Sequence, residues 1–108
     1  MKFTINQHSL TESISIVQRA ISTRAISKEL EGVLITLENG KLKLTGTDSE
    51  IISIETYKDA LVIEEGSTLV NARLFGDIIR KRPNETIEIE VKGDRMFINV
   101  QNSNFELL

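Results

Sequence analysis

One pattern of secondary structure occurs twice in this 108-residue chain, and it constrains the fold more than any single motif. In each half, a short strand leads into a helix, and three strands follow, the first two of them joined as a hairpin. The two short strands align as Phe3–Asn6 and Thr68–Asn71. A β-α-β-β-β unit repeated in this way predicts an α+β fold with antiparallel sheets and both helices on one side of them.

The first helix is predicted by a capping signal and an apolar stripe. Ser9 and Glu12 have the spacing of a capping box, in which the serine accepts from the backbone and the glutamate reaches back. An apolar stripe at helical spacing follows, made of Leu10, Ile14, Val17 and Ile21. Such a stripe is far more typical of core packing than of a cofactor site. Residues 22–31 show no strong period, and we expect a polar connection there.

Two tight turns predict the hairpins. Asn39-Gly40 separates VLITLE from KLKLTG, and this dipeptide readily supplies the two positive φ angles of a type I′ turn. Gly93-Asp94 separates TIEIEVK from RMFINV in the same way. The third strands are predicted at residues 50–57 and 104–108, and residues 58–67 are expected to hold a looser connection.

The second helix, NARLFGDIIRKRP at residues 71–83, has an apolar side and a basic side. Asn71 is a good N-cap, and Pro83 ends the helix close to Arg82. The apolar side is formed by Leu74, Phe75, Ile78 and Ile79, and the basic side by Arg73, Arg80 and Lys81. Arg73 falls in the first turn, where the helix dipole disfavours a cation, and this position suggests an anionic partner. The alternative is an ordinary solvated helix face.

Composition excludes several classes of protein. A 40% hydrophobic content suits one compact domain over residues 1–108. The absence of cysteine excludes disulfides, thiolate metal sites and a thiol nucleophile. Without a signal-like N-terminus or a long apolar run, we expect a soluble cytoplasmic protein that does not enter a membrane. A net charge of −3 argues against gripping nucleic acid with the whole surface, but it allows a local contact.

Motifs for catalysis or metal binding are lacking. His8 is the sole histidine and precedes the predicted helix, where a surface or capping role is more typical than catalysis. Asp48 and Glu50 could share a metal ion, but no further ligands accompany them. Residues 92–100 partly match an RNA-binding strand, yet only Phe97 could stack on a base. We therefore expect a protein that is not an enzyme and needs neither a cofactor nor a metal.

Four segments in order carry a family resemblance: MKFTI at the start, LKLTGTDSE at residues 42–50, NARLFGDIIRK at residues 71–81 and SNFELL at the end. Together they resemble the N-terminal domain of the bacterial sliding clamp, the DNA polymerase III beta subunit. The resemblance spans essentially the whole chain. It implies a DNA-clamp fold and a homodimeric ring of three domains per chain, with the helices facing duplex DNA. It also implies a role in the processivity of DNA replication, with the polymerase and the clamp loader binding domains other than this one.

The resemblance also implies roles for single residues. Arg24 matches the family arginine that contacts DNA after the first helix, and Arg73 matches the arginine that opens the second. Arg80 and Lys81 are further candidates because they share the basic helix face with Arg73. Contacts of this kind to phosphates are independent of base sequence, as sliding requires. The sequence departs from the family pattern at Ser27-Lys28-Glu29, where relatives have an apolar stretch with proline, and at Arg82, where many have leucine.

Phe105 and Leu107 match apolar residues on the edge strand that pairs with the third domain of the second subunit. A bare edge strand with these side chains would otherwise promote aggregation. A rival hypothesis is a protein-interaction module that uses this edge to recruit a strand and does not encircle DNA. It differs from the clamp hypothesis in predicting that Arg24 and Arg73 are dispensable for binding. A third hypothesis is an enzyme with an acidic site around Asp48 and Glu50.

Overall fold

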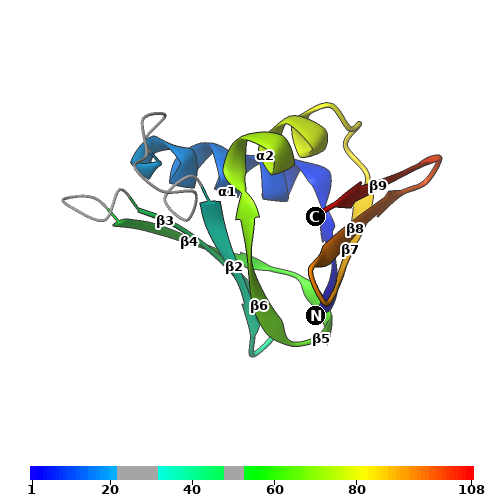
Figure 1. Cartoon of the computed structure of the whole chain (residues 1–108), viewed down its shortest axis with the longest axis horizontal. Coiled ribbons are helices and arrows are strands. Elements are labelled where there is room, and N and C mark those ends of the chain that lie inside the picture. Colours follow the sequence, from blue (N-terminus) through cyan, green and yellow to red (C-terminus); the bar gives the residue numbers. More distant parts are fainter. Residues whose placement is uncertain (22–31, 48–52) are drawn as a thin grey trace.

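The computed structural model describes residues 1–21, 32–47 and 53–108 (Figure 1). Its elements, in order, are β1 (Lys2–Asn6), α1 (Gln7–Val17), the 3₁₀ turn η1 (Gln18–Ala20), β2 (Gly32–Glu38), β3 (Lys41–Thr47), β4 (Ser53–Asp59), β5 (Leu61–Glu64), β6 (Gly66–Asn71), α2 (Ala72–Arg80), β7 (Thr86–Lys92), β8 (Arg95–Val100) and β9 (Ser103–Leu107). The predicted order of strands and helices is therefore present, with one strand more than expected.

Two antiparallel sheets form the body of the molecule. One has the order β5-β1-β7-β8-β9, and the other has the order β4-β3-β2-β6. Figure 1 shows α1 and α2 together along one side, with the sheets spreading apart beneath them. The predicted α+β class and the placement of both helices on one side are confirmed.

The core lies between the helices and the inner faces of both sheets. Alternate residues of the central strands point inward, as in the burial of Val33, Ile35 and Leu37 on β2. The helices add Leu10 and Ile14 from α1 and Phe75 and Ile79 from α2, all fully buried. Burying one such side chain contributes about 1.5–3 kcal/mol, so this shared core holds the helices in place.

The predicted turns have the expected backbone geometry. Asn39 and Gly40 have φ angles of 54° and 75°, which confirms the turn between β2 and β3. Gly93 has a φ angle of 61° in the turn between β7 and β8. These angles depend on the local dipeptide, and that is why the sequence revealed both hairpins.

The start of α1 differs from the prediction. Asn6, not Ser9, is the N-cap, and its Oδ1 accepts from the backbone N–H groups of His8 and Ser9 at 2.9 and 3.3 Å. The capping box is therefore absent, and Glu12 pairs with Lys58 of β4 instead. The helix starts early because β1 leads straight into it, with the Gln7 N–H donating to the Glu85 carbonyl at 2.9 Å.

The segment predicted as a looser connection contains β5. Only Ala60 separates β4 from β5, yet β4 pairs with β3 in one sheet and β5 pairs with β1 in the other. The prediction was wrong because β5 is a short edge strand with little burial. Leu61 and Ile63 are both more than half exposed, so the alternation that reveals a strand is faint.

The apolar side of α2 is narrower than predicted. Phe75 and Ile79 are fully buried, but Leu74 is 55% exposed and does not join the core. Ala72 and Gly76 complete the buried side. A Cβ at Gly76 would lie 3.2 Å from Ile14 Cγ2, so the small residue lets α1 approach closely. Neither helix in the described ranges is long and apolar enough to cross a bilayer.

Candidate nucleic-acid interface

The strands carry positive charge that is locally neutralised. Each lysine or arginine on a described strand lies within 4.0 Å of a carboxylate oxygen: Lys2 of Glu88, Lys41 of Asp59, Lys43 of Glu55, Lys58 of Glu12, Lys92 of Glu90 and Arg95 of Glu106. Exposed pairs of this type add little stability, but they remove net charge from the sheets.

The helix side differs in this respect. Across the described ranges, the cations without an ion pair are Arg19 in η1, Arg73 in α2, and Lys81 and Arg82 directly after α2. Glu12 and Asp77 are the only acidic residues within α1 and α2, and each already has a cationic neighbour. Uncompensated positive charge is therefore gathered on the helix side of an acidic chain.

Arg73 lies in the first turn of α2, as predicted, and its side chain is exposed. Asn71 caps this turn, with its Oδ1 accepting from the Leu74 N–H at 2.9 Å. The first turn of a helix carries partial positive charge from unpaired N–H groups. The Arg73 guanidinium and the N-terminal end of α2 therefore both favour an anion at this position.

Arg80 and Lys81 have different surroundings, although the sequence predicted that both lie on the basic face of the helix. Arg80 donates to Gln18 Oε1 and lies 3.9 Å from Asp77 Oδ1, so its guanidinium is turned toward α1. The Gln18 amide also donates to the Ala72 carbonyl at 3.3 Å and thereby ties the two helices. Lys81 is the C-cap residue and its side chain is exposed.

Sequence reasoning missed Arg19. This exposed arginine follows the apolar stripe of α1 and is flanked by half-buried Gln18 and buried Ala20. The only feature of the sequence that could have pointed to Arg19 is its place at the end of a predicted helix. Arg24, the first of the candidate DNA contacts, lies outside the described residues, as do Ser27-Lys28-Glu29, Asp48 and Glu50.

The β9 strand forms the outer edge of the five-stranded sheet. Phe105 and Leu107 are half-buried there and pack against the core from one side. The Arg82 guanidinium lies over the Phe105 ring, with its central carbon 4.7 Å from the ring centre. The two candidate interface residues therefore lie on one face of an edge strand, as their spacing of two predicted.

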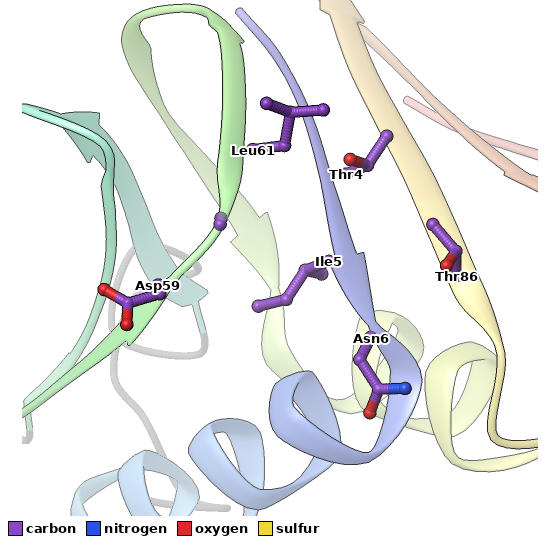
Figure 2. A pocket seen from close by; sticks show the side chains of 7 residues that line it. Thr4, Ile5, Asn6, Asp59, Leu61 and Thr86 are labelled. Atoms are coloured by element: carbon purple, nitrogen blue, oxygen red, sulfur yellow. The ribbon is translucent and has the colours of Figure 1, made fainter.

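A surface pocket of about 500 Å³ lies between β1, the junction of β4 with β5, and the start of β7 (Figure 2). Its lining is Thr4, Ile5, Asn6, Asp59, Ala60, Leu61 and Thr86. Asp59 is the one carboxylate among these residues, and hydrogen bonding from Lys41 lowers its pKa. The lining supplies no second acid or base for proton transfer. Within the described part of the chain, no three acidic, histidine or cysteine side chains gather to hold a metal.

The whole chain, residues 1–108, matches the family model described as the DNA polymerase III beta subunit, N-terminal domain. The beta sliding clamp of Bacillus subtilis (strain 168) is 38% identical over 91% of this chain, and that of Micrococcus luteus is 34% identical over 99%. The match covers 28% and 34% of those proteins, so the chain spans about a third of their length.

Solved structures agree with this relationship. The crystal structure of the DNA polymerase sliding clamp from Bacillus subtilis matches 98% of this chain and 30% of its own, with a TM-score of 0.93 and 33% identity. The agreement of sequence and fold extends over both halves of the repeat. The chain belongs to the DNA polymerase III beta subunit family, in which it matches the N-terminal domain.

Proposed function

We propose that residues 1–108 form one DNA-clamp domain, and that this domain works within a ring that encircles duplex DNA and keeps the replicative polymerase on its template. The observation that carries the proposal is that, among the residues the structure describes, unpaired positive charge is confined to the helix side of a clamp fold. The domain has a holding role and catalyses no reaction.

The proposed DNA contacts are made by Arg24, Arg73 and Lys81, with Arg80 as a weaker participant because Gln18 and Asp77 already engage it. Arg19 is added as a further contact on the basis of its exposure. Guanidinium and ammonium groups reach phosphate oxygens without reading bases. Contacts of this kind hold the duplex at many equivalent positions, so the ring slides.

The ring requires an interface, and we assign it to β9. Phe105 and Leu107 would meet the edge of a domain from a second subunit, and the unpaired backbone of β9 would continue the sheet across the contact. The polymerase and the clamp loader would bind other domains, and the complex would act in the cytoplasm. The rival function, strand recruitment at β9 without DNA, gives no role to the unpaired cations of the helix side.

Topological retention on DNA tests the proposal. This chain replaces its matching segment in the Bacillus subtilis clamp, and the chimeric protein is loaded onto circular duplex DNA. The expected result is retention on the circle and rapid loss when the circle is cut, because a ring slides off a free end. Loss at equal rates from circular and linear DNA would contradict encirclement.

Assembly tests the interface separately. Light scattering gives the mass of this chain mixed with the other two domains of the Bacillus subtilis clamp. A ring-sized complex is expected, and Phe105→Ala should abolish it. Lys92→Ala is the matched control, because Lys92 is an exposed strand residue away from β9. A complex that survives Phe105→Ala would refute the assignment of β9.

A further inference from the structure

The two halves of the chain pair their strands in the same register. On β1, Ile5 lies opposite Ile87 and Thr4 opposite Glu88 of β7. On β6, Val70 lies opposite Val33 and Leu69 opposite Leu34 of β2. Asn6 and Asn71, one residue beyond, both cap the helix that follows. In this internal symmetry β1 corresponds to β6, β7 to β2, β8 to β3, and β9 to β4.

The correspondence extends to the last residues of the chain. Lys41 is the first residue of β3 and lies opposite Asp59. In the corresponding strand β8, the second residue, Met96, lies opposite Leu107, so the first residue of β8 would lie opposite position 108. Position 108 therefore corresponds to Asp59 of the first half. After Asp59, the chain passes through Ala60 into β5.

The two halves differ in how the edge of the first strand is covered. β5 covers the outer edge of β1, with Leu61 opposite Thr4 and Val62 opposite Phe3. The corresponding edge of β6 has no strand beside it in the described residues, because β6 ends the order β4-β3-β2-β6. One of two equivalent edges is therefore paired, and the other is open.

The open edge lies beside a groove of about 270 Å³, in which apolar side chains are joined by the polar residues Thr68, Asp94 and Arg95. Its lining includes Leu69 and Val70 of β6, Met96 of β8, and Leu107 and Leu108. Leu69 is 49% exposed and Leu108 is 89% exposed. Apolar side chains next to unpaired strand backbone are a surface that another strand would cover.

We propose that the open edge of β6 binds an extended segment antiparallel to Ser67–Leu69, and that the occupant is the polypeptide joining this domain to the next in the longer family members. The matched relatives are about three times the length of this chain. Leu108 lies in the groove itself, so a chain continuing from it needs no long connection to reach β6. The inference rests on the proposed function, because it treats the chain as one domain of a longer protein.

The symmetry specifies the register of this pairing. Leu61 and Val62 stand two and three positions after Asp59 and lie opposite Thr4 and Phe3. The second position after Leu108 should therefore lie opposite Leu69, and the third opposite Thr68. Backbone pairing supplies the affinity, and the groove receives the apolar side chains.

A disulfide tests the register, because the chain itself contains no cysteine. The chain is extended from Leu108 with the residues that follow the matched segment in the Bacillus subtilis clamp, and Leu69→Cys is combined with a cysteine at the second added position. Directly opposed Cα atoms lie within bridging distance, so this variant should oxidise to an intramolecular disulfide. The matched control has its cysteine at the first added position and should oxidise at least about tenfold more slowly. Equal rates would overturn the proposed register.

Amide hydrogen exchange tests the pairing without cysteines. In the extended chain, the amides of Ser67–Leu69 that do not donate to β2 should exchange at least about tenfold more slowly than in the 108-residue chain. A glycine-serine extension of equal length should leave them unchanged. No slowing with the native extension would refute the inference, and slowing that appears only at high protein concentration would identify a second copy as the occupant.

The two proposals fail separately. Retention of the chimeric ring on circular DNA while these amides remain unprotected would refute the β6 pairing alone. Protected amides in a protein that never retains circular DNA would refute the clamp function and leave the pairing intact.

Discussion

The Arg82 guanidinium carbon lies 4.7 Å from the centre of the Phe105 ring, and this contact joins the end of α2 to the outermost strand of the five-stranded sheet. Arg82 Nε also donates to the Ile78 carbonyl at 3.3 Å, which holds the side chain against the helix. Arg82 thus covers one face of a candidate interface residue. The Phe105 ring is therefore covered on this side by a cation.

Replacing Arg82 should measure this contact. Arg82→Gln is expected to lower the free energy of unfolding by about 0.5–1 kcal/mol, the usual strength of a cation–π pair that solvent still reaches. Urea denaturation gives the value, and a double-mutant cycle with Phe105→Leu isolates the pair from its surroundings. Strictly additive effects of the two substitutions would show that the ring and the guanidinium do not interact.

Gly46→Ala should destabilise the protein by about 1–3 kcal/mol, the usual cost of overpacking. A Cβ at Gly46 would lie 2.5 Å from the Val17 carbonyl oxygen at the end of α1. That oxygen belongs to the backbone, so the helix itself would have to move away from β3. Thermal or urea unfolding provides the measurement. Gly93→Asn is the control, since Gly93 has open space around it and asparagine tolerates its positive φ angle.

The ion pair between Glu12 and Lys58 should make part of the stability depend on pH. Hydrogen bonding and charge from Lys58 lower the pKa of the Glu12 carboxyl below its ordinary value of 4.5. A carboxyl with a lowered folded-state pKa stabilises the fold above its unfolded pKa, and this contribution is lost as the pH falls through the folded value.

The variant Glu12→Gln isolates this contribution. Its stability deficit relative to the parent protein should be constant near neutral pH, should shrink as the pH falls below 4.5, and should vanish once the pH is below the lowered folded-state pKa, because the protonated glutamate then resembles glutamine. Urea denaturation across this pH range measures the difference. Glu38→Gln is the control, because Glu38 forms no ion pair in the described ranges. A deficit that persists in acid would have another cause than the ion pair.

Removal of Arg73 should weaken binding to duplex DNA without changing any base preference. Removing one phosphate contact reduces the slope of log affinity against log salt by about one. Fluorescence anisotropy at low salt compares Arg73→Ala, Arg24→Ala and Lys81→Ala with Lys92→Ala, which removes the same charge from a strand. If Lys92→Ala weakened binding as much as Arg73→Ala, net charge rather than the helix side would govern the contact.

The features predicted from the sequence depend on neighbouring residues. Asn39-Gly40 carries its own preference for positive φ angles, and Asn71 reaches the N–H of a residue three positions on. Periodicity identified Phe75 and Ile79 correctly, because a helix buries residues spaced at its own repeat. Phe105 and Leu107 on β9 were instead named from the family resemblance, and strand alternation explains only why they share one face.

The sequence did not show which of the candidate DNA contacts are already engaged by other residues of the chain. Arg80 and Lys81 are adjacent, yet Arg80 donates to Gln18, which is distant in the chain, and Lys81 stays exposed. A sequence indicates which residues carry charge, but ion pairs form between residues that folding brings together. The contrast between neutralised strands and uncompensated helices therefore belongs to the tertiary structure.

By itself, the sequence determined the presence of both helices, the hairpins and the twofold repeat, because periodicity and turn geometry operate over a few residues. Only the tertiary structure decided that Leu61–Glu64 leaves the sheet of β4 and pairs with β1. In the same arrangement, no strand among the described residues pairs with the corresponding edge of β6. Strand pairing of this kind depends on contacts between distant segments, and a weakly buried edge strand leaves little trace of its partner in the local pattern.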